Sequence, residues 1–174
     1  MSSIPFGRTL FRGALAAVLA TAAAACGGSN QTAQKSGGDA APAGSAAVPA
    51  DAPLAVVYKS PTCGCCNNWV KHMQDSGFRV ETHDQDNVDP VKDEAGVPQA
   101  MRSCHTAKIG GYAIEGHVPA DVIRQLLREH PADIVGLAVP GMVTGSPGME
   151  GPNPQHYDVV AFTKDGQTRV YASR

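Results

Sequence analysis

Three cysteines lie within four residues of one another in the segment Val57-Tyr-Lys-Ser-Pro-Thr-Cys-Gly-Cys-Cys-Asn-Asn-Trp69, at Cys63, Cys65 and Cys66. An apolar run precedes them and helical spacing follows, so the thiols are expected at a strand-to-helix turn. Unpaired N–H groups at a helix N-terminus stabilise thiolates. Thiolates are soft ligands that bind Cu(I), Zn(II) and iron–sulfur centres. The motif therefore predicts metal or redox chemistry rather than packing.

Cys63 and Cys66 also have the C-x-x-C spacing of a redox-active disulfide. A dithiol exchanger needs only two cysteines, however, and Cys65 between them would invite disulfide scrambling. Adjacent helical residues point about 100° apart, so Cys65 and Cys66 suit two ions of a multinuclear cluster better than one ion. Four thiolates would be neutralised by four Cu(I) ions, whereas one Zn(II) would leave two negative charges in a site of low dielectric constant. These arguments favour a multinuclear Cu(I) cluster over Zn(II).

The elements around the motif are predicted from apolar periodicity and turn residues. Strands are expected at 54–58, 78–82, 104–109, 112–115, 157–162 and 169–172, with helices at 67–76, at 88–95 and from Pro119 to just before Pro131. The Gly/Pro-rich segment 136–154 is expected to be a long loop; its Met142 and Met149 could offer soft donors, although packing against the domain is favoured. This order predicts an α/β fold, a thioredoxin-like domain with a mixed sheet.

A fourth cysteine, Cys104, lies in Ser103-Cys-His-Thr-Ala107, at the start of the strand predicted at 104–109. In a thioredoxin-like fold this place faces the N-terminus of the first helix, which makes Cys104 the expected fourth sulfur. Neighbours in extended chain point to opposite faces, so His105 should turn away from the metal, to an outer contact or the surface. His117 is expected to stabilise a turn rather than to reach the site. His72 lies two helical turns from Cys65 and is expected to be solvated.

The N-terminal third does not have the composition of a folded domain. Residues 1–25 have a basic start and an apolar stretch too short for a membrane span, so we expect an export signal. Cys26 follows Ala23-Ala-Ala, as in a bacterial lipoprotein signal, although Ala23 stands where leucine is usual; ordinary cleavage at Ala-x-Ala is the alternative. Residues 26–53 are expected to be a disordered tether for a metal-binding domain at 54–174. We therefore expect an exported protein, lipid-anchored on the periplasmic side of a bacterial membrane.

Charge and cysteine count limit the classes further. The chain has 14 Lys and Arg against 16 Asp and Glu, without a basic run, which excludes nucleic acid as an expected partner. Four cysteines remain after Cys26, and in an exported protein two structural disulfides would be the ordinary alternative. Adjacent cysteines fit such a framework poorly, because their side chains diverge.

The segment 54–174 resembles the CopG-type copper-resistance proteins of the bacterial periplasm. The resemblance rests on Cys63-Gly-Cys-Cys66 followed by Trp69, Gly96-Val-Pro98, Ser103-Cys-His-Thr-Ala107, Gly111-Tyr, Glu115-Gly-His-Val-Pro119, Gly136-Leu-Ala-Val-Pro-Gly-Met142 and Gly145-Ser-Pro-Gly-Met149. It implies a thioredoxin-like fold and a multinuclear Cu(I) cluster bridged by Cys63, Cys65, Cys66 and Cys104. It also implies a part in copper tolerance, with copper ions and other copper-handling proteins as partners, and leaves a copper oxidoreductase activity open. A thiol–disulfide oxidoreductase using Cys63 and Cys66, and a structural zinc domain, are the alternatives.

Overall fold

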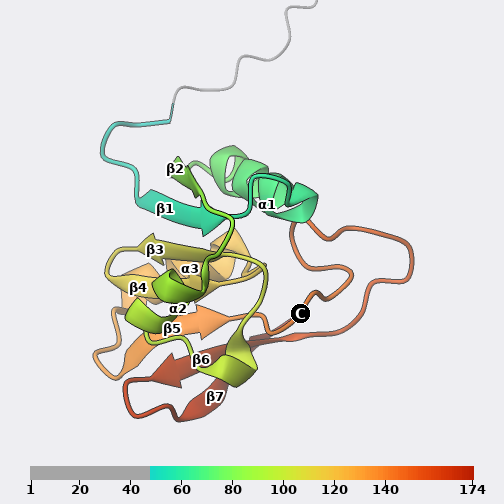
Figure 1. Cartoon of the computed structure of the whole chain (residues 1–174). Helices are drawn as coiled ribbons and strands as arrows, with labels where there is room; N and C mark the ends of the chain where they lie inside the picture. Colours follow the sequence, from blue (N-terminus) through green and yellow to red (C-terminus); the bar gives the residue numbers. More distant parts are fainter. Residues whose placement is uncertain (1–47) are drawn as a thin grey trace, which may run out of the picture. The chain divides into compact units, whose positions relative to one another are not determined.

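The computed structural model describes residues 48–174, so the predicted signal, Cys26 and most of the predicted tether lie outside the described residues. Seven strands form one mixed sheet in the order β2-β1-β3-β4-β5-β6-β7 (Figure 1). The elements are β1 (Leu54–Lys59), α1 (Gly64–Asp75), β2 (Arg79–Asp84), α2 (Asp89–Glu94), a 3-10 turn (Gln99–Met101), β3 (Thr106–Ile109), β4 (Tyr112–Glu115), α3 (Ala120–Glu129), β5 (Ile134–Ala138), β6 (Asp158–Thr163) and β7 (Thr168–Ser173). Within 48–174, no helix combines the length and apolar character that crossing a bilayer requires.

The strand pairing follows from the connections. β1 and β2 are parallel across α1, and β4 and β5 are parallel across α3, as expected for helical crossovers. The other neighbours are antiparallel, and the β3–β4 hairpin closes at Gly110 and Gly111, both with positive φ. The predicted mixed α/β sheet is therefore confirmed, whereas the narrower thioredoxin-like assignment stays a prediction.

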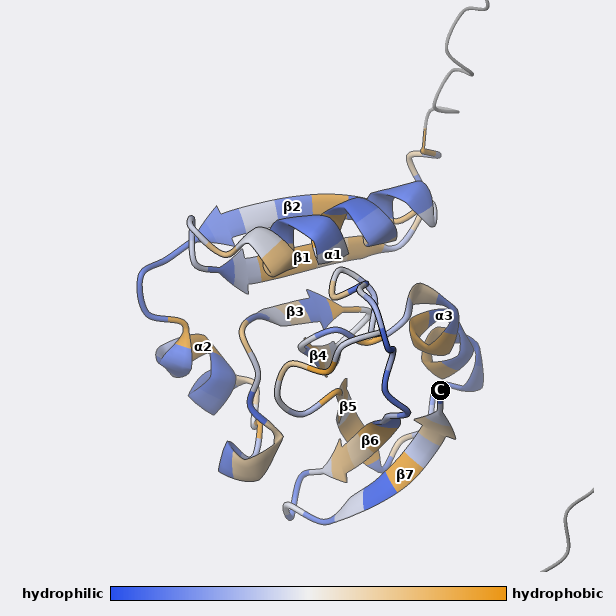
Figure 2. Cartoon of the chain, turned by 90° about the vertical axis from the view of Figure 1, so that its right-hand side faces the viewer, coloured by the Kyte–Doolittle hydropathy of each residue, from blue (hydrophilic) through white to orange (hydrophobic). Residues whose placement is uncertain are grey.

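Each face of the sheet has its own apolar core, because successive strand residues point to opposite sides. On one face, Trp69 and Met73 of α1 pack with Val122, Ile123 and Leu126 of α3. Helix α3 is apolar on its buried side and polar on the other (Figure 2). On the opposite face, a smaller cluster forms under the segment that contains α2 and the 3-10 turn; its members are Val97, Ala113, Ala138 and Phe162. The sheet is thus covered on both sides.

The predicted loop 136–154 begins too early, because its first residues belong to β5. In the sequence Gly136 indicates a loop, whereas in the structure it permits a close approach of two strands. A Cβ at Gly136 would lie 2.1 Å from the carbonyl oxygen of Ala113 and 2.5 Å from the ring of Phe162. This glycine is therefore required inside the sheet, and the irregular loop runs from Val139 to Tyr157 between β5 and β6.

Candidate metal centre

Helix α1 begins inside the cysteine motif, three residues before the predicted start at Asn67. Cys63 is its N-cap residue, and the Cys63 Sγ accepts the backbone N–H of Cys66 at 3.3 Å. A cysteine sulfur here takes the place of the Ser, Thr, Asp or Asn oxygen that usually caps a helix. All three motif sulfurs therefore lie in the first turn of α1, at the end of β1.

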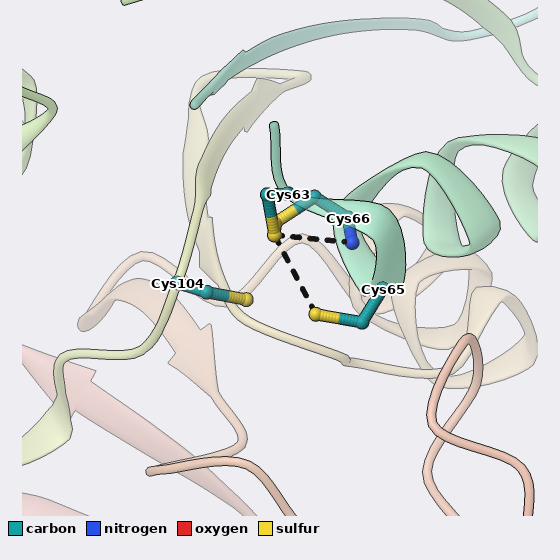
Figure 3. A group of neighbouring side chains, drawn as sticks. All are labelled: Cys63, Cys65, Cys66 and Cys104. Atoms are coloured by element: carbon teal, nitrogen blue, oxygen red, sulfur yellow. Dashed lines mark hydrogen bonds between the residues drawn. A yellow bond between two sulfur atoms is a disulfide. The ribbon is translucent and has the colours of Figure 1, made fainter. Parts of the chain in front are cut away.

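The segment before β3 brings Cys104 to this helix end. The four Sγ atoms of Cys63, Cys65, Cys66 and Cys104 all lie within 4.8 Å of one another. Cys66 is buried and the other three are half-buried. The sulfurs of Cys65 and Cys104 point toward each other (Figure 3). The predicted convergence of four sulfurs is thus present in the fold.

Two of these sulfurs are joined to each other. Cys63 and Cys66 form a disulfide, while Cys65 and Cys104 are free thiols. The Cys65 Sγ lies 3.5 Å from the Cys63 Sγ. Adding two electrons and two protons to the disulfide would release two more thiols, so all four sulfurs become available together only in the reduced protein.

The environment of the Cys104 thiol favours its protonated form. Burial, followed by the neighbouring Cys65, raises the pKa of the Cys104 thiol to about 11. Because only the thiolate binds metal, a metal ion that binds here must displace the Cys104 proton at neutral pH. Metal-free Cys104 is therefore held as a neutral thiol.

His117 lies beside Cys104, which the sequence prediction missed. The His117 Nε2 is 3.1 Å from the Cys104 Sγ, and the Nδ1 is 2.7 Å from the carbonyl oxygen of Pro147. A carbonyl only accepts, so Nδ1 carries the proton and Nε2 presents its lone pair to Cys104. Burial lowers the pKa of His117, which keeps the ring neutral. The neutral ring has the protonation state that a metal ligand needs.

The β3–β4 register would have located this histidine. Thr106 pairs with Glu115 and Ile109 with Tyr112, around the two-glycine turn. Continuing this antiparallel count places Cys104 opposite His117, and the bond from the Gly116 N–H to the His105 carbonyl shows that the pairing does continue. The tight Gly110-Gly111 turn was the signal that could have identified His117.

The prediction that His105 turns away from the Cys104 sulfur is wrong. The side chain is fully buried, with its ring 4.5 Å from that of Trp69. Its Nδ1 lies 3.4 Å from the Cys104 Sγ, and its Nε2 has no hydrogen-bond partner among the described residues. Burial, and then the nearby His117, hold the pKa of His105 well below its usual value. Alternation failed because both Cys104 and His105 precede β3, where strand geometry does not yet apply.

The β5–β6 loop lies against the first turn of α1. A Cβ at Gly148 would be 2.6 Å from the backbone nitrogen of Trp69 and 2.8 Å from the carbonyl oxygen of Cys65. The same loop supplies the Pro147 carbonyl that orients His117. Of the two loop methionines, Met142 is 56 % exposed and Met149 is half-buried. The loop is therefore part of the wall of the site.

The prediction for His72 is also corrected. Its Nε2 accepts the backbone N–H of Ala120 at 3.1 Å, which connects α1 to the start of α3. Burial lowers the pKa of His72, so this acceptor is held in its neutral form. The residue is half-buried and joins two helices instead of being solvated.

Comparison with known proteins relates this centre to a family. A family described as "Protein of unknown function, DUF411" matches residues 101–149, which contain Cys104, His105 and His117. Two solved structures of copper resistance protein CopG are similar. Form 2 is 44 % identical with a TM-score of 0.67, covering 71 % of this chain and 99 % of that one. Form 1 is 45 % identical with a TM-score of 0.65, covering 70 % and 96 %. No curated protein sequence matches significantly. The extent of these matches shows that the chain belongs to the CopG family of copper-resistance proteins.

Proposed function

We propose that this protein binds copper as its cargo, holding several Cu(I) ions on the sulfurs of Cys63, Cys65, Cys66 and Cys104. The observation that carries the proposal is the convergence of four cysteine sulfurs within 4.8 Å of one another. The sulfurs come from two segments far apart in the sequence, so the fold itself assembles the set. The relatives named copper resistance protein support copper as the metal.

The chemistry of the donors supports Cu(I). Thiolates are the soft ligands that Cu(I) prefers, and sulfurs this close together can bridge neighbouring ions. His117 adds a neutral nitrogen 3.1 Å from the Cys104 sulfur, with its other nitrogen fixed by a carbonyl, as is typical of metal-binding histidines. Several monovalent ions would also balance the charge of four thiolates, which one Zn(II) would not. A multinuclear Cu(I) site therefore fits this donor set better than a structural zinc site.

The disulfide between Cys63 and Cys66 favours one rival function, that of a thiol–disulfide oxidoreductase. It also connects the two functions, because the same bond removes two of the four sulfurs from a metal site. A copper oxidoreductase that uses this coupling is compatible with the site. The rival requires only Cys63 and Cys66, whereas the copper site also requires Cys65 and Cys104.

The experiment compares the reduced protein with its disulfide form. Each is titrated anaerobically with Cu(I) in the presence of a competing chromophoric Cu(I) chelator. We expect the reduced protein to take up more Cu(I) per chain and to take it from stronger chelators, because four thiols are then available. Equal uptake by the two forms would contradict the proposal. Turnover of a small disulfide substrate that survives in Cys104→Ser would favour the rival instead.

We further propose that Cys26 is lipidated and holds the domain on the periplasmic side of a bacterial membrane. The supporting observation is the Ala23-Ala-Ala-Cys26 sequence after a basic and apolar N-terminal segment. A diacylglycerol group with an acylated amine gives more than one acyl chain, which is enough for stable anchoring. Cys26→Ser is expected to move the protein from the membrane fraction to the soluble fraction. A wild-type protein that fractionates as soluble, with an unmodified N-terminus, would refute the anchor.

A further inference from the structure

A fully buried ion pair lies next to the cysteine centre. The Lys92 Nζ of α2 and the Glu115 Oε1 of β4 are 2.6 Å apart, and their side chains are 3 % and 0 % exposed. Taking two charges out of water costs much of what their attraction returns, and apolar residues of similar volume often give equal or greater stability. Stability alone therefore does not explain the presence of this pair.

Both carboxylate oxygens of Glu115 contact the chain that carries Cys104. Oε1 accepts the backbone N–H of Ser103 at 2.6 Å, and Oε2 accepts the hydroxyl of Thr106 at 2.6 Å. The Lys92 Nζ donates to the same Thr106 hydroxyl at 3.0 Å, so this hydroxyl accepts from Lys92 while it donates to Glu115. One carboxylate thus holds the chain on both sides of Cys104.

Other contacts also hold the segment around Cys104, among them the packing of buried His105 against Trp69 of α1. Cys104 lies between the 3-10 turn and β3, outside any regular element. On its N-terminal side, the Ser103 hydroxyl donates to the Gly141 carbonyl at 2.5 Å; on its C-terminal side, the His105 carbonyl accepts the Gly116 N–H. Glu115 is the residue that connects the two sides through a buried, charge-assisted contact. The carboxylate therefore contacts the backbone or side chain of residues on both sides of Cys104.

We propose that Glu115, with Lys92 as its counter-charge, is a positioning residue that holds the Cys104 sulfur against the sulfurs of α1. This inference rests on the proposed metal function for its purpose, but its geometry can be tested without metal. It assigns the costly buried pair to the alignment of a ligand rather than to the stability of the fold. Outer contacts of this kind usually affect metal affinity strongly when they are removed.

Two double variants test the contacts that Glu115 makes with Ser103 and Thr106. Lys92→Met/Glu115→Gln removes both charges but keeps an oxygen that can accept the Ser103 N–H. Lys92→Met/Glu115→Leu removes the charges and the acceptor. Neither variant leaves an unpaired buried charge, so both are expected to fold. A second pair leaves Lys92 and Glu115 intact: Ser103→Pro removes the donated N–H, whereas Ser103→Ala keeps it and removes only the hydroxyl.

The metal-free measurement uses the full chain with Cys63→Ser and Cys66→Ser, in which Cys65 and Cys104 remain in the site. Oxidised glutathione is added, and formation of the Cys65–Cys104 disulfide is followed by peptide mass spectrometry. We expect the glutamine and alanine variants to cross-link at close to the parent rate. The leucine and proline variants should cross-link about tenfold more slowly. With the native cysteines restored, only these two should lose Cu(I) affinity, by about 10–100-fold.

Equal cross-linking rates for the glutamine and leucine variants, and also for the alanine and proline variants, would overturn the positioning role. A glutamine variant that cross-links as slowly as the leucine variant would overturn it too. If the leucine variant does not fold, the Ser103 pair decides the matter alone. A wild-type protein that fails to bind Cu(I), together with the expected cross-linking differences, would refute the proposed function and leave the positioning role intact. The two failures are therefore distinguishable.

Discussion

Cu(I) added anaerobically to the reduced protein is expected to raise its melting temperature by more than about 10 °C, and to raise that of Cys104→Ser much less. A ligand that binds only the native state adds about 4 kcal/mol of stability when its free concentration is about 1,000 times Kd. Cys104 lies before β3, whereas the other three sulfurs lie in the first turn of α1. A metal cluster that uses Cys104 therefore requires the folded chain.

Without Cys104, the remaining sulfurs are all within residues 63–66, a segment that can also bind metal in the unfolded chain. Binding to both states gives little net stabilisation, which is why the shift should shrink. Thermal denaturation followed by circular dichroism measures both shifts, with each metal-free protein as its own baseline. Equal copper-induced shifts in wild type and Cys104→Ser would remove Cys104 from the site.

Gly148→Ala is expected to weaken Cu(I) binding by about 10–100-fold, whereas Gly141→Ala should weaken it by less than about threefold. Both glycines have positive φ, at +82° and +73°, so both substitutions incur backbone strain of about 1–3 kcal/mol. Only the Cβ at 148 meets the backbone of α1, at 2.6 Å from the Trp69 nitrogen; at 141 nothing lies within 4 Å. The loop must therefore move away from α1 only in Gly148→Ala.

The consequence of that movement passes through His117. When the loop moves, the Pro147 carbonyl no longer holds the His117 Nδ1, so the ring is free to turn its Nε2 away from Cys104. Competition with a Cu(I) chelator gives the affinities of both variants. A Gly148→Ala protein that binds Cu(I) as tightly as Gly141→Ala would show that loop docking and His117 orientation contribute nothing to the site.

The convergence of Cys104 on Cys63, Cys65 and Cys66 could be predicted from the sequence. The Cys motif follows an apolar run and precedes helical spacing, and Cys104 begins a strand of the predicted hairpin. The predicted order of elements therefore brings the four residues toward one another. The mixed sheet could also be predicted from this order of strands and helices. Metal binding by these four residues is not settled by their convergence and stays a prediction.

Other features depend on contacts that local patterns do not contain. The sequence predicts Gly136 as a loop residue, because it does not show that the Ala113 carbonyl approaches this glycine from β4. The burial of His105 depends on Trp69, which comes from α1. His117 differs, because counting pairs back from the Gly110-Gly111 turn would have placed it opposite Cys104. The register of the short β3–β4 hairpin could thus be predicted from the sequence, whereas packing between segments distant in sequence could not.

The most direct test of the copper site is the number of Cu(I) ions bound per chain, measured by native mass spectrometry on reduced protein under anaerobic conditions. We predict more than one Cu(I) for the wild type, and fewer in Cys63→Ser, Cys65→Ser, Cys66→Ser and Cys104→Ser, because each sulfur would bridge more than one ion. Saturation at a single Cu(I), with Cys65→Ser unchanged, would contradict the account.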